Sequence, residues 1–308
     1  MDLLKCKAFV KVIERQSITL AAKEMGYSQP GISHMMDALE REVGFPLFVR
    51  SKHQIIPTPA GKELLFHARN IVKSSEQFEE TVMSINGLLK GSITIGSYHT
   101  PLKEYLPQLI LEFHTAFKNI GINVIEFASP ELNSSLTSNE SDMGFMCNPI
   151  PPDFEFYPLL DDHYCIIMNE HHPLAAYDTV PLKLLNGCNL ITPQNGWDEI
   201  VQEVLAAANI DNYKTDYHIS SDVGSVALAA KGLGIFVTSE LQTSLLPRGA
   251  VVRRLDTELH RTMGLAVRSL KNASPAAKEF IKFAIARADY HGTCKTKAKS
   301  RSKRETAD

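Results

Sequence analysis

The residues best suited to chemistry stand together near the start of the chain. Ser28-Gln29-Pro30 opens a predicted helix, and Ser33 and His34 follow Gln29 by four and five residues. A glutamine can hydrogen-bond bidentately to adenine N6 and N7, and a proline can contact a thymine methyl group. Ser33 and His34 can reach the same major groove from the first turns of the helix. The pattern therefore predicts a helix face that reads base edges in double-stranded DNA.

The flanking residues predict a helix-turn-helix that would position this face. Thr19 can cap a helix over residues 20–25, Gly26 follows its end, and Ser28 caps the next helix with Pro30 in its first turn. Apolar residues at i, i+4 and i+7 of this second helix share the opposite face, and they are Ile32, Met36 and Leu39. Small helical bundles that bind nothing can have the same turn, so the motif alone leaves both interpretations open.

A predicted β-hairpin, or wing, makes DNA binding the more specific interpretation. Two β-prone runs, at residues 47–50 and 54–56, flank Ser51-Lys52-His53 directly after the helices. We expect Arg50, Lys52 and His53 to meet the phosphate backbone or the adjacent minor groove, with Thr19 and Ser28 completing the DNA-binding set. For Arg50 a second role, packing on the wing and bracing it, is equally open.

A long helix is predicted over residues 59–90, with Thr58 as its cap and Pro59 in its first position. Mostly apolar residues from Leu64 to Leu89 follow one another at alternating steps of four and three residues. This spacing is typical of the heptad seam of a coiled coil, and Ser75 is the one polar residue in it. The seam predicts dimerisation with a second copy; an amphipathic helix lying on its own domain is the alternative. The predicted dimerisation residues are Leu64, Ala68, Ile71, Phe78, Val82, Ile85 and Leu89.

From residue 91 onward the sequence predicts α/β structure. Short apolar strands such as 92–96 and 122–127 alternate with helices such as 102–117, and a second series begins at 165. A link near Leu160-Asp161-Asp162 suggests two lobes. The expected domains are 1–58 for DNA binding, 59–90 for the linker helix, 91–290 for effector binding and 291–308 as a basic disordered tail. Within 91–290, lobe 1 would comprise about 91–161 and 266–290, and lobe 2 about 162–265.

Polar residues at predicted strand ends indicate a ligand site between these lobes. Ligands of such sheets bind at the carboxyl ends of strands and at helix N-termini, where free N–H groups favour a polar or anionic molecule. Any one of these residues could instead cap a helix or lie in a loop, so the prediction concerns the set. It consists of Ser97, His99, Thr100, Ser129, Thr192, Gln194 and Asn195.

Composition excludes several classes of protein. The 308 residues are 44% hydrophobic and 22% charged, which excludes a disordered chain and a coiled-coil rod. No apolar run approaches the roughly 18 residues of a membrane span, and the N-terminus lacks a secretory signal, so we expect a cytoplasmic protein.

Charge is unevenly distributed along the chain. Residues 1–62 contain nine Lys/Arg and six Asp/Glu, and residues 295–304 contain six Lys/Arg, whereas residues 63–294 have a net charge of −10. This segregation suggests a polyanion partner for the ends.

Motifs for catalysis or cofactors are not found. The five cysteines are an odd number without close pairs, which predicts reduced, mostly buried thiols, although redox sensing stays open. Glu170-His171-His172 lacks metal-ligand spacing. Gly232-Leu233-Gly234 follows a predicted helix, whereas a dinucleotide fingerprint follows a strand. We therefore predict no catalytic residues, no metal and no cofactor.

The combined pattern resembles the LysR-type transcriptional regulators, most closely over residues 1–65. The resemblance implies a winged helix-turn-helix, a linker-helix dimer and a two-lobed effector domain like a periplasmic binding protein. It also implies a dimer of dimers on an interrupted palindrome. Family positions depart at Met25, Gly31, His34 and Met36, of which His34 replaces a frequent Arg or Lys. The residues that carry the resemblance are Phe9, Val12, Ser17-Ile18, Ala21-Ala22, Ser28-Gln29-Pro30-Gly31-Ile32-Ser33, Leu39-Glu40, Gly44, Leu47-Phe48, Arg50 and Thr58-Pro59-Ala60-Gly61.

The predicted function is a sequence-specific, DNA-binding transcriptional regulator that responds to a small-molecule effector between the lobes. Two alternatives remain at this stage: an architectural DNA-binding protein without a ligand, and an enzyme with an appended DNA-binding domain. No nucleophile elbow or P-loop supports the enzyme.

Overall fold

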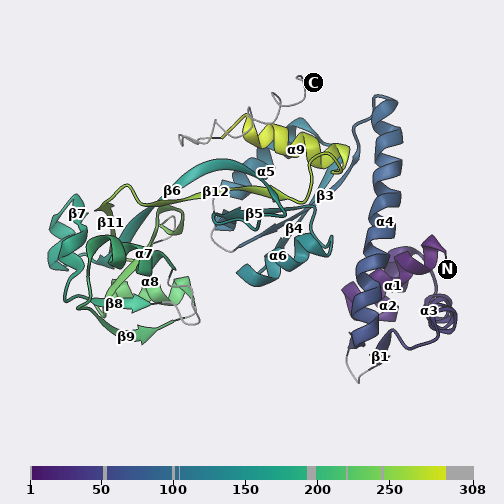
Figure 1. Cartoon of the computed structure of the whole chain (residues 1–308), viewed down its shortest axis with the longest axis horizontal. Helices are drawn as coiled ribbons and strands as arrows, with labels where there is room; N and C mark the ends of the chain where they lie inside the picture. Colours follow the sequence, from purple (N-terminus) through teal and green to yellow (C-terminus); the bar gives the residue numbers. More distant parts are fainter. Residues whose placement is uncertain are drawn as a thin grey trace, which may run out of the picture.

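The computed structural model describes residues 2–50, 54–98, 101–103, 105–192, 199–219, 221–243 and 246–288. Figure 1 shows three parts in series: a helical N-terminal part, one long helix, and an α/β part with two lobes. This arrangement confirms the predicted fold class. Among the described residues, no helix combines the length and the apolar character that crossing a lipid bilayer requires.

Three helices form the N-terminal part: α1 (Leu3–Arg15), α2 (Ile18–Met25) and α3 (Gln29–Val43). The Ser28 hydroxyl accepts the Gly31 N–H and caps α3, as predicted. The predicted cap of α2 is wrong. Ser17 has an extended backbone and accepts the Leu20 N–H, so Thr19 lies in the first turn of the helix with its side chain exposed.

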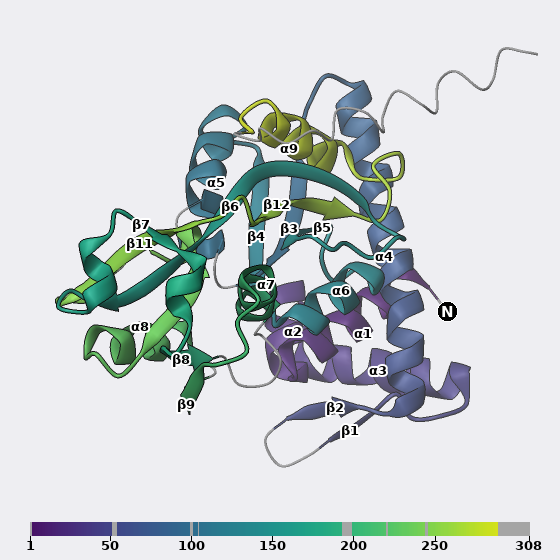
Figure 2. The same cartoon turned by 60° about the vertical axis from the view of Figure 1, so that its left-hand side comes forward.

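The core of this part lies where the three helices meet. Ile32, Met36 and Leu39 are buried on one face of α3, which confirms the predicted periodicity. Ala21 and Ala22 are also buried, so that α2 and its neighbours approach closely. A hairpin of β1 (Phe48–Arg50) and β2 (Ile55–Pro57) follows, with Arg50 opposite Ile55. Figure 2 shows this wing extending from the helices.

The long helix α4 (Pro59–Ile85) begins at the Thr58 cap and packs first on the helical part. Leu65 and Ala68 are its buried apolar residues, and both belong to the core formed by α1–α3. The helix ends at Ile85, five residues before the predicted end. Asn86 is its C-cap and Gly87 has a φ of +77°, a left-handed conformation that glycine adopts without strain and that ends the helix.

Lobe 1 is a mixed sheet with helices on both faces. Strands β3, β4 and β5 are parallel, and α5 and α9 cover one face through Phe113 and Phe280. On the other face, Leu132 and Leu136 of α6 pack against Met146. The elements are β3 (Gly91–Ser97), η1 (Pro101–Lys103), α5 (Tyr105–Ala116), β4 (Ile120–Glu126), α6 (Ser129–Thr137), β5 (Met143–Cys147) and α9 (Pro275–Ile285).

Lobe 2 repeats this layering. Val201 and Val204 of α7 pack on one face of its sheet, and Val226 and Ala229 of α8 pack on the other. Its elements are η2 (Pro173–Ala176), β7 (Thr179–Pro181), η3 (Leu182–Leu185), β8 (Asn189–Thr192), α7 (Glu199–Ala208), β9 (Lys214–His218), α8 (Asp222–Ala230), β10 (Ile235–Ser239), η4 (Glu240–Gln242) and β11 (Ala250–Asp256).

Two long strands, β6 (Glu155–Asn169) and β12 (His260–Val267), join the lobes. The sheet order β4-β3-β5-β12-β6-β10-β8-β9 is continuous through them, as Figure 1 shows. The link predicted near Leu160-Asp161-Asp162 is therefore the interior of a strand. The predicted strand over 165–168 is only the second half of β6, because the first half pairs with β12 and the second half with β10 and β11.

A buried ion pair lies where these strands pass between the lobes. The Asp162 carboxylate has no exposed surface and accepts the Arg261 Nε–H at 2.8 Å and the Leu241 N–H at 3.0 Å. Arg261 also donates to the Ser239 hydroxyl at 2.8 Å. Burial by itself would lower the pKa of Arg261, but the adjacent Asp162 carboxylate outweighs that effect and the pKa is raised. Arg261 thus remains charged and ties β6, β10 and β12 together.

We predict that Arg261→Met destabilises the α/β part by about 3–5 kcal/mol, because it leaves the Asp162 carboxylate buried without a counter-ion. The measurement is the free energy of unfolding in urea, followed by the fluorescence of Trp197, the single tryptophan of the chain. The matched control is Arg254→Met. Arg254 pairs with Glu240 on the surface, with its side chain 68% exposed, so the loss should stay below about 1 kcal/mol. Equal losses for the two variants would contradict the role assigned to Asp162–Arg261.

Candidate DNA-reading surface and effector site

The first half of α3 presents the predicted reading residues to solvent. Gln29, Pro30 and His34 are exposed, while Ile32 between them is fully buried in the core. The Ser28 hydroxyl is occupied as the helix cap, which leaves it less free to contact DNA than the sequence suggests. This surface is thus a row of unengaged side chains on a helix that is held rigidly from behind.

Arg50 joins the wing to this helix. Its guanidinium lies 3.3 Å from the Ser33 hydroxyl and 3.5 Å from an Asp37 carboxylate oxygen. These contacts are the bracing role that the sequence left open, and they partly occupy Ser33. Arg50 remains about half exposed, so its free N–H groups still face solvent. Lys52 and His53 at the predicted wing tip lie outside the described residues.

The predicted dimerisation residues divide into three groups along the chain. Leu64 and Ala68 pack against the core of the same subunit's helical part. Leu89 lies beyond the end of α4 and packs against the core of lobe 1, so it does not belong to the helical seam. The exposed members are Ile71, Phe78, Val82 and Ile85, of which Phe78 is 72% and Ile85 80% exposed.

The structure describes part of the predicted effector set. Ser97 is fully buried at the end of β3, and its hydroxyl donates to the Tyr98 carbonyl at 3.0 Å. Thr192 is buried at the end of β8, with its hydroxyl 2.8 Å from His218 Nδ1. Ser129 is the first residue of α6, and its side chain is not among those described. His99, Thr100, Gln194 and Asn195 lie outside the described residues.

His218 is a polar residue near Thr192 that the sequence interpretation missed. It ends β9, which pairs with β8 in parallel so that Thr192 stands directly opposite His218. The carboxyl ends of neighbouring parallel strands meet at one edge of a sheet, which is where such folds bind ligands. The sequence predicts a strand over residues 216–220, which places His218 in its middle, whereas the structure ends β9 at His218. The strand end and the strand order that place His218 beside Thr192 were therefore not available from the sequence.

The cysteines of the described residues are free thiols. Cys6 and Cys165 are buried, and burial raises the pKa of both, as it does for the partly buried Cys188. A protonated thiol is a poor nucleophile. These three cysteines therefore have the character of small apolar residues, and among the described residues no group of three or more His, Cys, Asp or Glu side chains is placed to hold a metal ion.

Comparison with known proteins agrees with this architecture. Residues 3–62 match the family model of bacterial regulatory helix-turn-helix proteins of the lysR family, and residues 86–289 match the LysR substrate binding domain. The uncharacterized HTH-type transcriptional regulator YvbU of Bacillus subtilis is 31% identical over 92% of this chain and 98% of its own length.

A full-length OxyR variant from Pseudomonas aeruginosa has the same fold, with a TM-score of 0.74 at 24% identity over 94% of this chain and 96% of that one. The effector binding domain of QuiR in complex with shikimate gives a TM-score of 0.58 at 24% identity over 65% of this chain and 97% of that one. Family models that span most of the chain, together with this relative, show that the protein belongs to the LysR family of transcriptional regulators.

Proposed function

We propose that this regulator binds a specific DNA site as a dimer through α3, and that a small molecule held between the two lobes changes that binding. The observation that carries the proposal is the division of α3 into two faces. One face is fully buried through Ile32, Met36 and Leu39, and the other exposes Gln29, Pro30 and His34. Such a protein works where the chromosome is, in the cytoplasm.

DNA recognition would divide between these exposed residues and the wing. Gln29 near the N-terminus of α3 can pair with an adenine in the major groove, and His34 one turn further along can contact a neighbouring base or phosphate. Arg50 would hold the wing against α3 and direct its remaining N–H groups to the phosphate backbone. Affinity would come mainly from phosphate contacts, and the choice of sequence from Gln29.

Dimerisation would use the end of α4. Phe78, Val82 and Ile85 present apolar side chains to solvent in the single chain, within a few turns of one another. An exposed apolar strip of this kind is covered when a second copy packs against it. In a two-fold symmetric interface each of these residues would contribute once from each subunit. Two reading helices would then address two half-sites of a palindrome, and further pairing of dimers would extend this to four.

The effector would lie at the strand ends where Thr192 and His218 meet. The match to the LysR substrate binding domain and the fold shared with the shikimate complex of QuiR support this placement. A ligand shifts the equilibrium between two arrangements only if it binds one of them more tightly. The long strand β6 would transmit that preference, because its first half pairs with β12 and its second half with β10 and β11 of lobe 2.

The first expected outcome concerns base reading. Gln29→Ala should weaken binding to the specific site by about 1–3 kcal/mol and change binding to random DNA little, because only the base contact is lost. Lys52→Ala is the comparison. It should weaken binding to the specific site and to random DNA alike, and it should reduce the salt dependence of that binding, since it removes a phosphate contact. Fluorescence anisotropy at several salt concentrations measures both. A loss on random DNA as large as that on the specific site would exclude Gln29 as a reading residue.

The second expected outcome concerns assembly. Phe78→Asp combined with Val82→Asp should convert the full-length dimer to a monomer, because each buried side chain of this type contributes roughly 1.5–3 kcal/mol and symmetry doubles the effect. Sedimentation velocity gives the oligomeric state. Val223→Asp is the control, since Val223 is 67% exposed on α8 in lobe 2. Persistence of the dimer in the double variant would remove α4 from the interface.

The third expected outcome concerns the effector. Thr192→Val keeps the shape of the side chain and removes the hydroxyl that faces His218. In a titration of the full chain with shikimate and other small carboxylates, the ligand that binds the wild type should bind this variant at least tenfold more weakly. The melting temperature without ligand should change little. If no ligand raises the melting temperature of the wild type, an architectural DNA-binding protein becomes the better description.

A further inference from the structure

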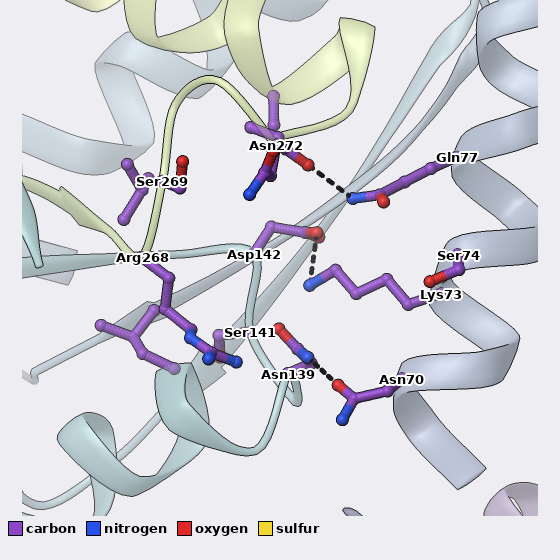
Figure 3. Close-up of a pocket in the computed structure, with 14 residues that line it drawn as sticks. Asn70, Lys73, Ser74, Gln77, Asn139, Ser141, Asp142, Arg268, Ser269 and Asn272 are labelled. Carbon is purple, nitrogen blue, oxygen red and sulfur yellow. Dashed lines mark hydrogen bonds and ion pairs between the residues drawn. The ribbon is translucent and has the colours of Figure 1, made fainter. Parts of the chain in front are cut away.

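A cavity of about 250 Å³ lies between α4 and lobe 1, away from the strand ends discussed above. Figure 3 shows its two walls: one is a face of α4, and the other comes from the turns before β5 and after β12. The α4 wall is formed by Asn70, Lys73, Ser74 and Gln77, whose spacing of three and four residues places them on one helix face. The exposed apolar residues of α4, such as Phe78 and Val82, follow a different face.

The contacts across this cavity are polar. Lys73 Nζ lies 2.8 Å from an Asp142 carboxylate oxygen, and the Gln77 amide donates to the Asn272 carbonyl at 3.3 Å. Asn139 also donates to the side-chain oxygen of Asn70. The residues that α4 buries, Gly61, Leu65 and Ala68, all lie nearer its N-terminus. The gap is therefore lined by hydrogen-bonding groups that a polar ligand could satisfy.

Its two cationic side chains, Lys73 and Arg268, retain free hydrogen-bond donors. Asp142 is satisfied on both oxygens, by Lys73 and by the Thr94 N–H at 2.7 Å. The Lys73 ammonium retains two of its three N–H groups. Arg268 is exposed and makes one bond, at 3.3 Å, to the Thr137 carbonyl, which leaves most of its five N–H groups free. Figure 3 shows both cationic groups directed toward the gap.

The nearby acidic residues Glu76, Glu80 and Glu140 do not line the cavity. Glu140 pairs with Arg69 at 3.5 Å, and Glu80 accepts the Ser92 N–H at 3.1 Å. Burial raises the pKa of Glu76, and the nearby Asp142 carboxylate adds to this effect, while Lys7 and Lys11 of α1 oppose it. The charged groups on the wall are therefore Lys73, Arg268 and the neutralised Asp142, with a net charge of +1 that suits one anionic group.

We infer that this cavity is a second effector site, which binds a small hydroxylated carboxylate. Arg268 and Lys73 donate to the carboxylate of the ligand, and the amides of Asn70 and Gln77 bind its hydroxyl groups. Because the walls belong to two different parts of the chain, the ligand binds fully only when α4 is docked on lobe 1. It thereby favours this arrangement of the DNA-binding part relative to the effector domain.

The test is isothermal titration calorimetry of the full chain with D-gluconate, L-malate and D-glycerate at constant ionic strength. At least one should bind with one site per chain, and Arg268→Gln should weaken that binding at least tenfold. Arg268→Lys should retain most of the affinity. The control is Arg287→Gln, which removes the same charge from a lobe 1 surface pair with Glu112 and should leave the affinity unchanged.

Three results would overturn the inference. The first is no saturable binding of any of the three compounds to the wild type. The second is equal affinity in Arg268→Gln, with melting curves showing that the variant is folded. The third is a loss in Thr192→Val but not in Arg268→Gln, which would assign the ligand to the region between the lobes. A supporting result would be reciprocal coupling between the two ligands. Specific DNA and the carboxylate should each change the affinity of the protein for the other, and the two factors should be equal.

Discussion

The buried ion pair between Asp162 and Arg261 is the interaction on which the α/β part most depends. The charge of a carboxylate with no exposed surface has to be compensated, and here the Arg261 guanidinium on β12 and the Leu241 N–H of η4 supply that compensation. The pair lies where β6 and β12 pass from one lobe into the other. The lobes therefore share continuous strands instead of a loose connection, and any relative movement has to bend or twist these strands.

The helix α4 has three sections that differ in their side-chain chemistry. The chemistry of each section determines which contacts it makes. Near its N-terminus, Leu65 and Ala68 bind it to the helical part through apolar contacts. In the middle, Lys73 and Gln77 hold it to lobe 1 through an ion pair and a hydrogen bond. At its end, Ile85 is left exposed. The Lys73 and Asp142 side chains are 20% and 16% exposed, so salt screens this pair only in part. The joint between α4 and lobe 1 thus depends on polar groups, whereas the contact of α4 with the helical part is apolar.

The reading helix and the joint are connected through rigid elements. α3 is fixed from behind by Ile32 and Met36 and from the wing side by Arg50, so it moves as one body with the start of α4. On the other side of the joint, Asp142 accepts the Thr94 N–H within β3, the strand that ends at Ser97. Asp142 therefore contacts both β3, through the Thr94 N–H, and α4, through Lys73.

The sequence by itself determined the features that depend on near neighbours in the chain. The core face of α3, the Ser28 cap, the wing after Leu47 and the start of α4 at Pro59 all follow from spacings of a few residues, because helix periodicity and caps are local properties. The exposure of Gln29 and His34 was predictable for the same reason, because both lie on the face of α3 opposite its buried residues.

Only the tertiary structure decided features that depend on distant pairing. Asp162 and Arg261 are 99 residues apart, and no local pattern marks them as partners. The continuity of β6 through Leu160-Asp161-Asp162 arises because β12 pairs with its first half, and β10 and β11 pair with its second half. Leu89 fits the heptad spacing, yet it packs on lobe 1 because Gly87 has already ended the helix. The cavity between Lys73 and Arg268 is likewise absent from any sequence pattern, since its walls meet only when α4 docks on the folded lobe.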